Sequence, residues 1–402
     1  MATAASTPSS SASPFPVVHW TEGGRARVAR WRSERGAPPP GRVVEVNDTT
    51  TADEAYGLAC QGTGLLWRGD FQNARQMLKA LASRADRPAR KPKRGAATRA
   101  ATTPLGTPAM AAAFNLHRQA RGQRARTLGM LIVELDADYL VHLRRAPDIR
   151  EACREAYGPP SEPSVVSLRE LLGLVGAHEW RAKGIEIPAA GGRIHSHYGV
   201  FAPVRSEYVD LVAKAPLPPA VAETGVAFDV GTGTGVLAAV LARRGVARVV
   251  ATDRDPRALA CARANVAALG LGRSVEVVDA DLYPEGRAGL VLCNPPWIPA
   301  RPSSPLEAAI YDPDSRMLRG FLAGLGAHLA PGGEGWLILS DLAEHLGLRT
   351  RSELLAAIDA AMLRVVERRD VRPVHPKASD ATDPLHAARA AETTSLWRLA
   401  PR

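Results

Sequence analysis

The fold is decided by the stretch Phe228-Asp229-Val230-Gly231-Thr232-Gly233-Thr234-Gly235-Val236-Leu237. An apolar run leads into three glycines at alternate positions and then into a helical pattern, which predicts a strand, a tight turn and a helix in that order. Glycine lets the chain turn tightly and lets a ligand lie against bare backbone. The helix that follows would offer free N–H groups to an anionic part of that ligand.

Acidic residues flank this loop at informative positions. Asp253, which lies 20 residues after Gly233, ends the next apolar run and is placed to accept hydrogen bonds from ribose hydroxyls. Asp229 lies two residues before Gly231, where dinucleotide-binding dehydrogenases have an apolar residue, and the glycine spacing is one residue shorter than in GxGxxG. A carboxylate beneath the loop suits a ligand with an amino group. Asp281, past the third strand, is placed to accept from an adenine amino group, although it could also be a turn or cap residue.

Strands and helices alternate around this loop. The pattern predicts strands at 227–230, 248–253, 275–278, 290–294, 336–340, 364–371 and 394–399. It predicts helices at 235–243, 256–268, 316–329 and 352–363. The fold class expected is therefore α/β, with a doubly wound, mostly parallel sheet of seven strands.

A proline-containing tetrad, Asn294-Pro295-Pro296-Trp297, directly follows the fourth of these strands. A cis or otherwise rigid double-proline turn would point the Pro295 carbonyl and the Asn294 side chain at one spot. Two such acceptors can hold both hydrogens of an NH2 group and aim its lone pair, so that catalysis would be positioning for an in-line displacement. Trp297 offers a face on which a planar amide or base can stack. A loop that only ends the strand is the structural alternative.

Together, the glycine loop, Asp253, Asp281 and the tetrad resemble the class I S-adenosylmethionine-dependent methyltransferases that modify amide or exocyclic amino nitrogens. The most similar members are the release-factor glutamine methyltransferases, followed by the N6-adenine and guanine-N2 nucleic-acid enzymes. The resemblance spans about residues 198–345 and implies a Rossmann-like fold with S-adenosylmethionine as cofactor. By position, it implies donor binding by Asp229, Gly231, Thr232, Gly233, Gly235, Asp253, Arg254, Asp281, Leu282 and Asn294. It implies a catalytic acceptor site made of Asn294, Pro295, Pro296 and Trp297.

The sequence departs from this family at Trp297, where tyrosine is commoner, and at Gly289, where many relatives have an acid. Glu207 lies in a segment similar to the entry of the family domain, so it is a further donor candidate. The long segment 298–315 is typical of a lid or a substrate contact. Further acceptor-side candidates are Arg301 and Tyr311, whereas packing or exposure is the favoured interpretation of His195, His197 and Tyr198.

The rest of the chain predicts a modular organisation. We expect residues 1–48 to be disordered because they mix Ser, Ala, Pro and Arg without periodicity. Six basic residues and no acid between 87 and 109 predict a flexible basic linker. The expected segments are 1–48 disordered, 49–86 helical, 87–109 linker, 110–197 a helical accessory region with a β-hairpin around a Gly-Gly turn, and 198–402 the methyltransferase domain.

Composition excludes several classes of protein. No window approaches eighteen consecutive apolar residues, so no membrane association is expected, and residues 1–21 lack the apolar stretch of a secretory signal, which favours a cytoplasmic location. The four cysteines form no CxxC pair and the ten histidines no HExxH, so no metal is expected. The net charge is +10, and residues 1–100 hold 16 basic against 8 acidic side chains. The basic segment 87–99 is a candidate nucleic-acid contact.

The tetrad suits two classes of macromolecular acceptor, a protein and a nucleic acid, because a carboxamide and an aromatic amine present the same NH2 geometry. The helical unit and hairpin favour a protein glutamine, and the basic linker favours adenine N6 or guanine N2 in RNA or DNA. An inactive binding module is a third hypothesis, against which the intact tetrad argues. Phosphate contacts would give binding a steep salt dependence, which separates the first two.

Overall fold

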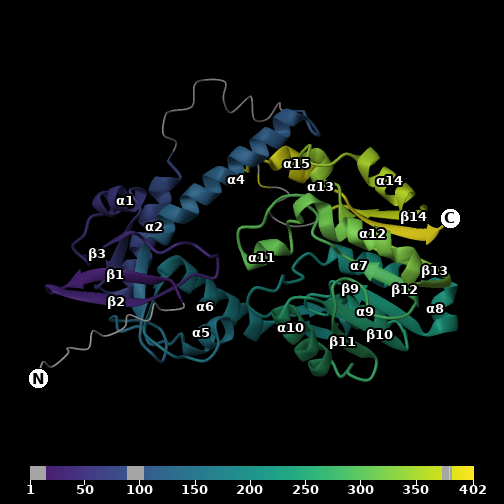
Figure 1. Cartoon of the computed structure of the whole chain (residues 1–402), viewed down its shortest axis with the longest axis horizontal. Coiled ribbons are helices and arrows are strands. Elements are labelled where there is room, and N and C mark those ends of the chain that lie inside the picture. Colours follow the sequence, from purple (N-terminus) through teal and green to yellow (C-terminus); the bar gives the residue numbers. More distant parts are fainter. Residues whose placement is uncertain (1–14, 88–103, 374–379, 381–382) are drawn as a thin grey trace, which may run out of the picture. The chain divides into compact units, whose positions relative to one another are not determined.

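The computed structural model describes residues 15–87, 104–373, 380 and 383–402 (Figure 1). The described chain forms two compact units, one from residues 15–87 with 122–175 and one from residues 104–121 with the described residues of 176–402. Helices α4 (Pro108–Gly129) and α6 (Leu168–Lys183) each contribute residues to both units. The first 14 residues and residues 88–103 of the expected basic linker lie outside the described residues.

The first unit is built on a six-stranded sheet in the order β1-β2-β6-β5-β4-β3. Its strands are β1 (Val17–Glu22), β2 (Arg25–Arg32), β3 (Arg42–Val46), β4 (Thr63–Trp67), β5 (Leu131–Leu135) and β6 (Ser164–Ser167). Its own helices are α1 (Ala52–Cys60), α2 (Phe71–Ala85) and α5 (Arg150–Tyr157). The β1–β2 and β5–β6 pairs are antiparallel, and the other three pairs are parallel.

This sheet differs from the disorder expected over 1–48 and from the all-helical expectation for 49–86. In β1 and β2, Val18, Trp20, Ala29 and Trp31 are buried in one core. The same strands also carry exposed arginines such as Arg25 and Arg27, so an Arg-rich composition does not reveal that β2 has a buried face. The expected helical accessory region likewise contains the strands β5 and β6. Thr51 caps α1, because its side chain accepts from Glu54 N.

The second unit begins with the hairpin predicted from the Gly-Gly turn, in which β7 (Ile185–Ile187) pairs antiparallel with β8 (Gly192–Ile194) through the 3-10 turn η1 (Pro188–Ala190). Its remaining strands are β9 (Val226–Val230), β10 (Arg248–Asp253), β11 (Val275–Asp279), β12 (Ala288–Cys293), β13 (Leu329–Ser340), β14 (Leu363–Val371) and β15 (Thr394–Pro401). Its longer helices are α7 (Glu207–Lys214), α9 (Val236–Arg243), α10 (Pro256–Ala268), α12 (Arg316–His328) and α14 (Arg351–Ala360). Shorter turns are α8 (Pro219–Thr224), α11 (Pro305–Ala308), η2 (Pro313–Ser315), α13 (Leu342–His345) and α15 (His386–Ala390).

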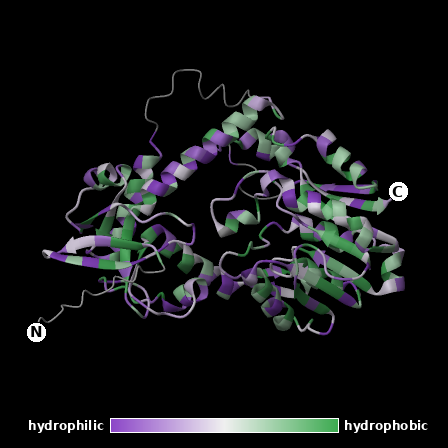
Figure 2. Ribbon diagram, in the orientation of Figure 1, coloured by the Kyte–Doolittle hydropathy of each residue, from purple (hydrophilic) through white to green (hydrophobic). Residues whose placement is uncertain are grey.

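Seven of these strands form one sheet in the order β11-β10-β9-β12-β13-β15-β14, in which only β15 runs against its neighbours. The central strands β9 and β12 are mostly apolar and buried (Figure 2), as expected for a sheet covered on both faces. Helices α7 and α9 share one core with the sheet, and α12 and α14 share the core of the opposite face (Figure 1). The doubly wound, mostly parallel fold predicted from the sequence is thus confirmed. None of the helices that the structure describes is long and apolar enough to cross a bilayer.

Candidate active site

The glycine loop joins β9 to α9 and turns on three left-handed residues. Gly231, Gly233 and Gly235 have φ angles of 74°, 56° and 80°, which L side chains rarely adopt. The N–H groups of Gly231 and Thr232 both donate to the Thr252 carbonyl, at 2.9 and 2.8 Å, so the loop is tied to the end of the neighbouring strand β10. The local sequence therefore fixes the loop at the carboxyl edge of the sheet, where ligands bind in open α/β sheets.

Asp229 lies beneath this loop with only 1% of its surface exposed. Its Oδ2 accepts from Thr232 Oγ1 at 2.6 Å and from Ala238 N at 3.0 Å. Burial raises the pKa of this carboxyl to about 6, although the two hydrogen bonds oppose the shift. The Asp253 charge adds to the increase. The charged form of a carboxyl buried in this way is stabilised by a cationic group nearby.

Asp253 ends β10 and meets the loop directly. Its Oδ2 accepts from Gly233 N at 3.0 Å, and its Oδ1 accepts from the N–H groups of Arg254 and Asp255 at 2.8 and 3.0 Å. Burial raises the pKa of Asp253, against the effect of these three bonds. The sequence placed Asp253 beside the loop correctly. Its role toward a ribose remains a proposal.

Glu207, at the start of α7, adds a third acid to this neighbourhood. Its Oε1 is buried and has no hydrogen-bond partner among the described residues. Burial, and then the charges of Asp229 and Glu207, raise the pKa of Tyr208, so both acids lie near this tyrosine. The partners of Asp229 and Asp253 are a hydroxyl and backbone N–H groups, none of which carries a positive charge. Three acids that have no cationic partner among the described residues fit a donor that has an ammonium and a sulfonium group.

Asp281 and its neighbours lie just past β11. Asp281 Oδ2 is 3.0 Å from Arg316 Nη2, and its Oδ1 is 3.5 Å from Arg254 Nη1. Leu282 has a φ of 77°, and its carbonyl accepts from Thr252 Oγ1 at 2.5 Å. The structure therefore brings these residues to the same edge as the glycine loop, with the Asp281 oxygens already paired to two exposed arginines.

The tetrad follows β12, which lies beside β9 with Cys293 in register with Val230. Asn294 is thus next to the glycine loop. The described residues contain no cis peptide bond, so the double proline is trans. Trp297 Nε1 donates to Asn294 Oδ1 at 2.9 Å, which orients the amide and leaves the second lone pair of Oδ1 free.

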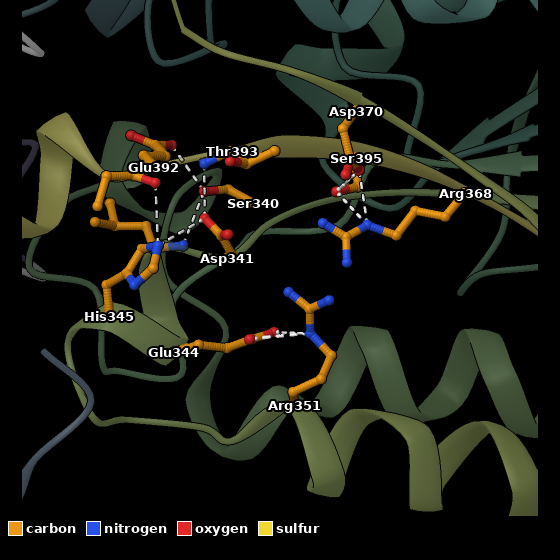
Figure 3. A network of polar contacts seen from close by, with 12 residues as sticks. Ser340, Asp341, Glu344, His345, Arg351, Arg368, Asp370, Glu392, Thr393 and Ser395 are labelled. Atoms are coloured by element: carbon orange, nitrogen blue, oxygen red, sulfur yellow. Dashed lines mark hydrogen bonds and ion pairs between the residues drawn. The ribbon is translucent and has the colours of Figure 1, made fainter.

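A polar network that the sequence did not reveal supports Trp297. The Arg205 guanidinium lies 5.6 Å from the centre of the Trp297 ring and donates to both oxygens of Glu392, at 2.9 and 3.2 Å. The Glu392 side chain is fully buried and also accepts from Ser340 Oγ at 2.7 Å. Figure 3 shows how the ends of β13 and β15 bring Glu392 and Ser340 together, with Asp341 beside them. Asp341 accepts from Thr393 N at 2.7 Å and so joins the two strand ends a second time.

Residues 298–315, here named the acceptor loop, come directly after the tetrad. The loop is closed at its base, where Ile298 N donates to Ile310 O at 3.1 Å and Asp312 N donates to Ile298 O at 2.8 Å. Arg118 of α4 donates to the Arg301 carbonyl at 2.7 Å and lies 4.2 Å from the centre of the Tyr311 ring. Tyr311 and the Arg301 backbone therefore hold the loop on α4, a role that the sequence did not predict.

The remaining candidates have structural partners. His195 N donates to Asn265 Oδ1 at 2.8 Å, and its ring Nδ1 is 2.7 Å from the Arg181 carbonyl. His197 N donates to Cys261 Sγ at 3.4 Å, and the Tyr198 ring lies 5.6 Å from the Arg257 guanidinium. These contacts agree with the packing interpretation. No group of three or more His, Cys, Asp or Glu residues suited to a metal occurs in the part of the chain that the structure describes.

Comparison with known proteins agrees with this geometry. Residues 191–345 match the family model described as the methyltransferase small domain. The chain is 39% identical over 145 residues to the release factor glutamine methyltransferase of Cereibacter sphaeroides, covering 35% of this chain and 48% of that protein. It is 38% identical over 147 residues to the ribosomal protein L11 methyltransferase of Pelotomaculum thermopropionicum, covering 36% and 40%. A solved geranyl diphosphate methyltransferase aligns with a TM-score of 0.38 at 11% identity, covering 49% of this chain and 85% of that one.

The second unit therefore contains a stretch, residues 191–345, that matches the methyltransferase small domain, in agreement with the resemblance that the sequence predicted. In sequence this domain is related to the release factor glutamine methyltransferases and the L11 methyltransferases. The chain spans less than half the length of these curated relatives.

Proposed function

We propose that this chain is an S-adenosylmethionine-dependent N-methyltransferase that acts on an amide or exocyclic amino nitrogen of a macromolecule. The observation that carries the proposal is the position of Asn294, one residue beyond β12 and beside the strand that enters the glycine loop. The donor residues and the acceptor tetrad then share one edge of the sheet. Asp229, Asp253 and Glu207 would hold the donor there.

The chemistry assigned to the chain is positioning. S-adenosylmethionine supplies an electrophilic methyl group on a sulfonium. Asn294 Oδ1 and the Pro295 carbonyl would accept the two hydrogens of the acceptor NH2 and direct its lone pair toward the donor. Trp297, fixed by its bond to Asn294 and by Arg205 on its ring, would stack on the planar amide or base. Asn294 is neutral, so no strong base is assigned, and the proton would leave to water.

A protein glutamine is the favoured acceptor. The relatives at 37–44% identity include several release factor glutamine methyltransferases and an L11 methyltransferase, and both names describe protein substrates. A nucleic-acid base is the second candidate, which the six basic residues of 87–99 favour. Within α4, Arg118 is 3.6 Å from Glu307 and Arg124 is 2.7 Å from Asp86, so acids already partner two of its arginines.

The test is to incubate the full chain with methyl-labelled S-adenosylmethionine and a cell extract, and then to digest with nuclease or protease. We expect protease to release the label and nuclease to leave it in place. Label released by nuclease would establish the base instead. Label transfer by Asn294→Ala should fall about 10²-fold or more while donor binding, measured by calorimetry, stays near normal. Normal turnover in this variant would contradict the proposed acceptor site.

A further inference from the structure

The acceptor loop ends in a strained corner at the start of α12. Asp314 and Ser315 are consecutive non-glycine residues with φ angles of 56° and 52°. Such left-handed residues cost free energy and persist where their surroundings impose them. Here the Asp312 carboxylate, inside the loop, accepts from Met317 N at 2.9 Å and from Leu318 N at 3.2 Å. The loop and the first turn of α12 are therefore joined as one piece.

Met317 in this first turn reaches the glycine loop. A Cβ on Gly231 would collide with Met317 Cε, so the methionine methyl group lies directly on bare loop backbone. Glycine is needed at position 231 both for its φ of 74° and for this close approach. A ligand bound to such a loop lies against the surface that glycine leaves open. Met317 borders that surface.

The same turn also contacts the candidate donor residues that follow β11. Arg316 Nη2 is 3.0 Å from Asp281 Oδ2. One turn later, a Cβ on Gly320 would lie 2.6 Å from Leu282 Cδ1, so the helix backbone packs closely on Leu282. Three residues of α12 thus contact Gly231, Asp281 and Leu282, which are all members of the predicted donor set. None of the three α12 residues belongs to that set.

We propose that the first turn of α12 is a wall of the donor site, and that Arg316 and Met317 transmit donor occupancy to the acceptor loop. This inference rests on the proposed donor site. A nucleoside that bonds to Asp281 would compete with Arg316 for the carboxylate, and a ligand on the glycine loop would pack on Met317 or displace it. Because Asp312 and the corner at Asp314 tie this turn to residues 298–315, its displacement changes the acceptor loop. Donor binding then precedes and prepares acceptor binding.

Hydrogen exchange followed by peptide mass spectrometry tests the inference on the full chain, with and without saturating S-adenosylhomocysteine. In the wild type, we expect the ligand to slow exchange in peptides from 229–236 and, by about fivefold or more, in peptides from 298–315. Protection of 229–236 with no change at 298–315 overturns the coupling and leaves the donor site intact. Absence of protection at both places overturns the donor site, and with it the proposed function.

Variants separate coupling from folding. Met317→Ala should weaken S-adenosylhomocysteine binding about threefold to tenfold and abolish the protection of 298–315, while 229–236 stays protected. Met317→Leu, which keeps an apolar side chain of similar volume, should restore protection at 298–315. Arg319→Gln, a change of an exposed arginine on the same helix, should behave as the wild type. Retained protection in Met317→Ala, or the same loss of protection in Arg319→Gln, contradicts the proposed role of Met317.

Discussion

At the scale of single residues, the unusual feature of the donor edge is a group of carboxylates held by hydrogen bonds and not by cations. Asp229 is the extreme case, because it is buried and its pKa is raised to about 6 by that burial. Its unfolded-state pKa is near 3.8, so the folded protein binds a proton more tightly than the unfolded chain. Between these two values, stability falls as the pH rises, and above pH 6 the cost is complete.

Asp229→Asn removes this titration. The free energy of unfolding of the variant, relative to the wild type, should therefore increase by about 2.4 kcal/mol between pH 4 and pH 7. Urea unfolding at a series of pH values, without donor, measures the difference, and the comparison cancels the other carboxyls that titrate in the same range. A difference between the two proteins that does not vary with pH would show that Asp229 ionises normally.

The candidate site residues that can be predicted from the sequence are those marked by a short local motif. Asp229 and Asp253 are set by their spacing from the glycines, and Asn294 by the proline tetrad. Arg205 and Glu392 could not be found in this way, because 187 residues separate them and each alone is an ordinary charged residue. The role of Met317 could not be predicted either, because a methionine at helical spacing indicates only packing.

At the scale of elements, the sheet of the second unit was predictable because each of its first strands is a short apolar run bounded by turn residues. The sequence predicts β10 with its observed bounds, and β9 and β11 within one residue. It misses the first seven residues of β13, because Pro331-Gly332-Gly333 signals a turn. These residues nevertheless continue the strand, which pairs with β12 across a bulge between Ala288 and Leu290.

The pair Arg205–Glu392 is expected to stabilise the junction between β13 and β15. Glu392→Gln removes the buried charge that pairs with the guanidinium beside Trp297, so the free energy of unfolding should fall by about 3 kcal/mol. The matched control is Glu276→Gln in the exposed pair with Arg248, where a change below about 0.5 kcal/mol is expected. Chemical denaturation of both variants provides the comparison. Equal effects would mean that burial of the Arg205 pair contributes nothing.

At the scale of the whole molecule, two compact units with separate cores are expected to respond differently to ligand. Saturation with S-adenosylhomocysteine at about 100 times its Kd should stabilise the unit that holds β9–β12 by about 2.7 kcal/mol. Leu66→Ala, at a fully buried position in the first unit, should destabilise that unit by about 2–5 kcal/mol and leave ligand binding unchanged. Differential scanning calorimetry with and without ligand measures both effects. A single transition that both changes shift together would contradict independent units.

The first unit also shows where prediction from composition fails at this scale. Its β2 strand reads Arg-Ala-Arg-Val-Ala-Arg-Trp-Arg, which resembles a basic solvated segment. Only the pairing with β1 and β6 reveals that one face of the strand is covered. One sequence does not show which distant segments pair as strands. The sequence therefore predicts disorder and helices where the structure has a sheet with both parallel and antiparallel pairs.

The order in which the chain contributes to the two units has a consequence for shortened forms of the protein. The chain passes from the first unit to the second, back to the first and again to the second. Met110 and Phe114, from the early visit, pack in one core with Ile298 and Leu342, far downstream. A gene shortened to the stretch that matches the methyltransferase model would lose these two side chains and uncover that core. No single cut in the chain therefore separates the two units and leaves both intact.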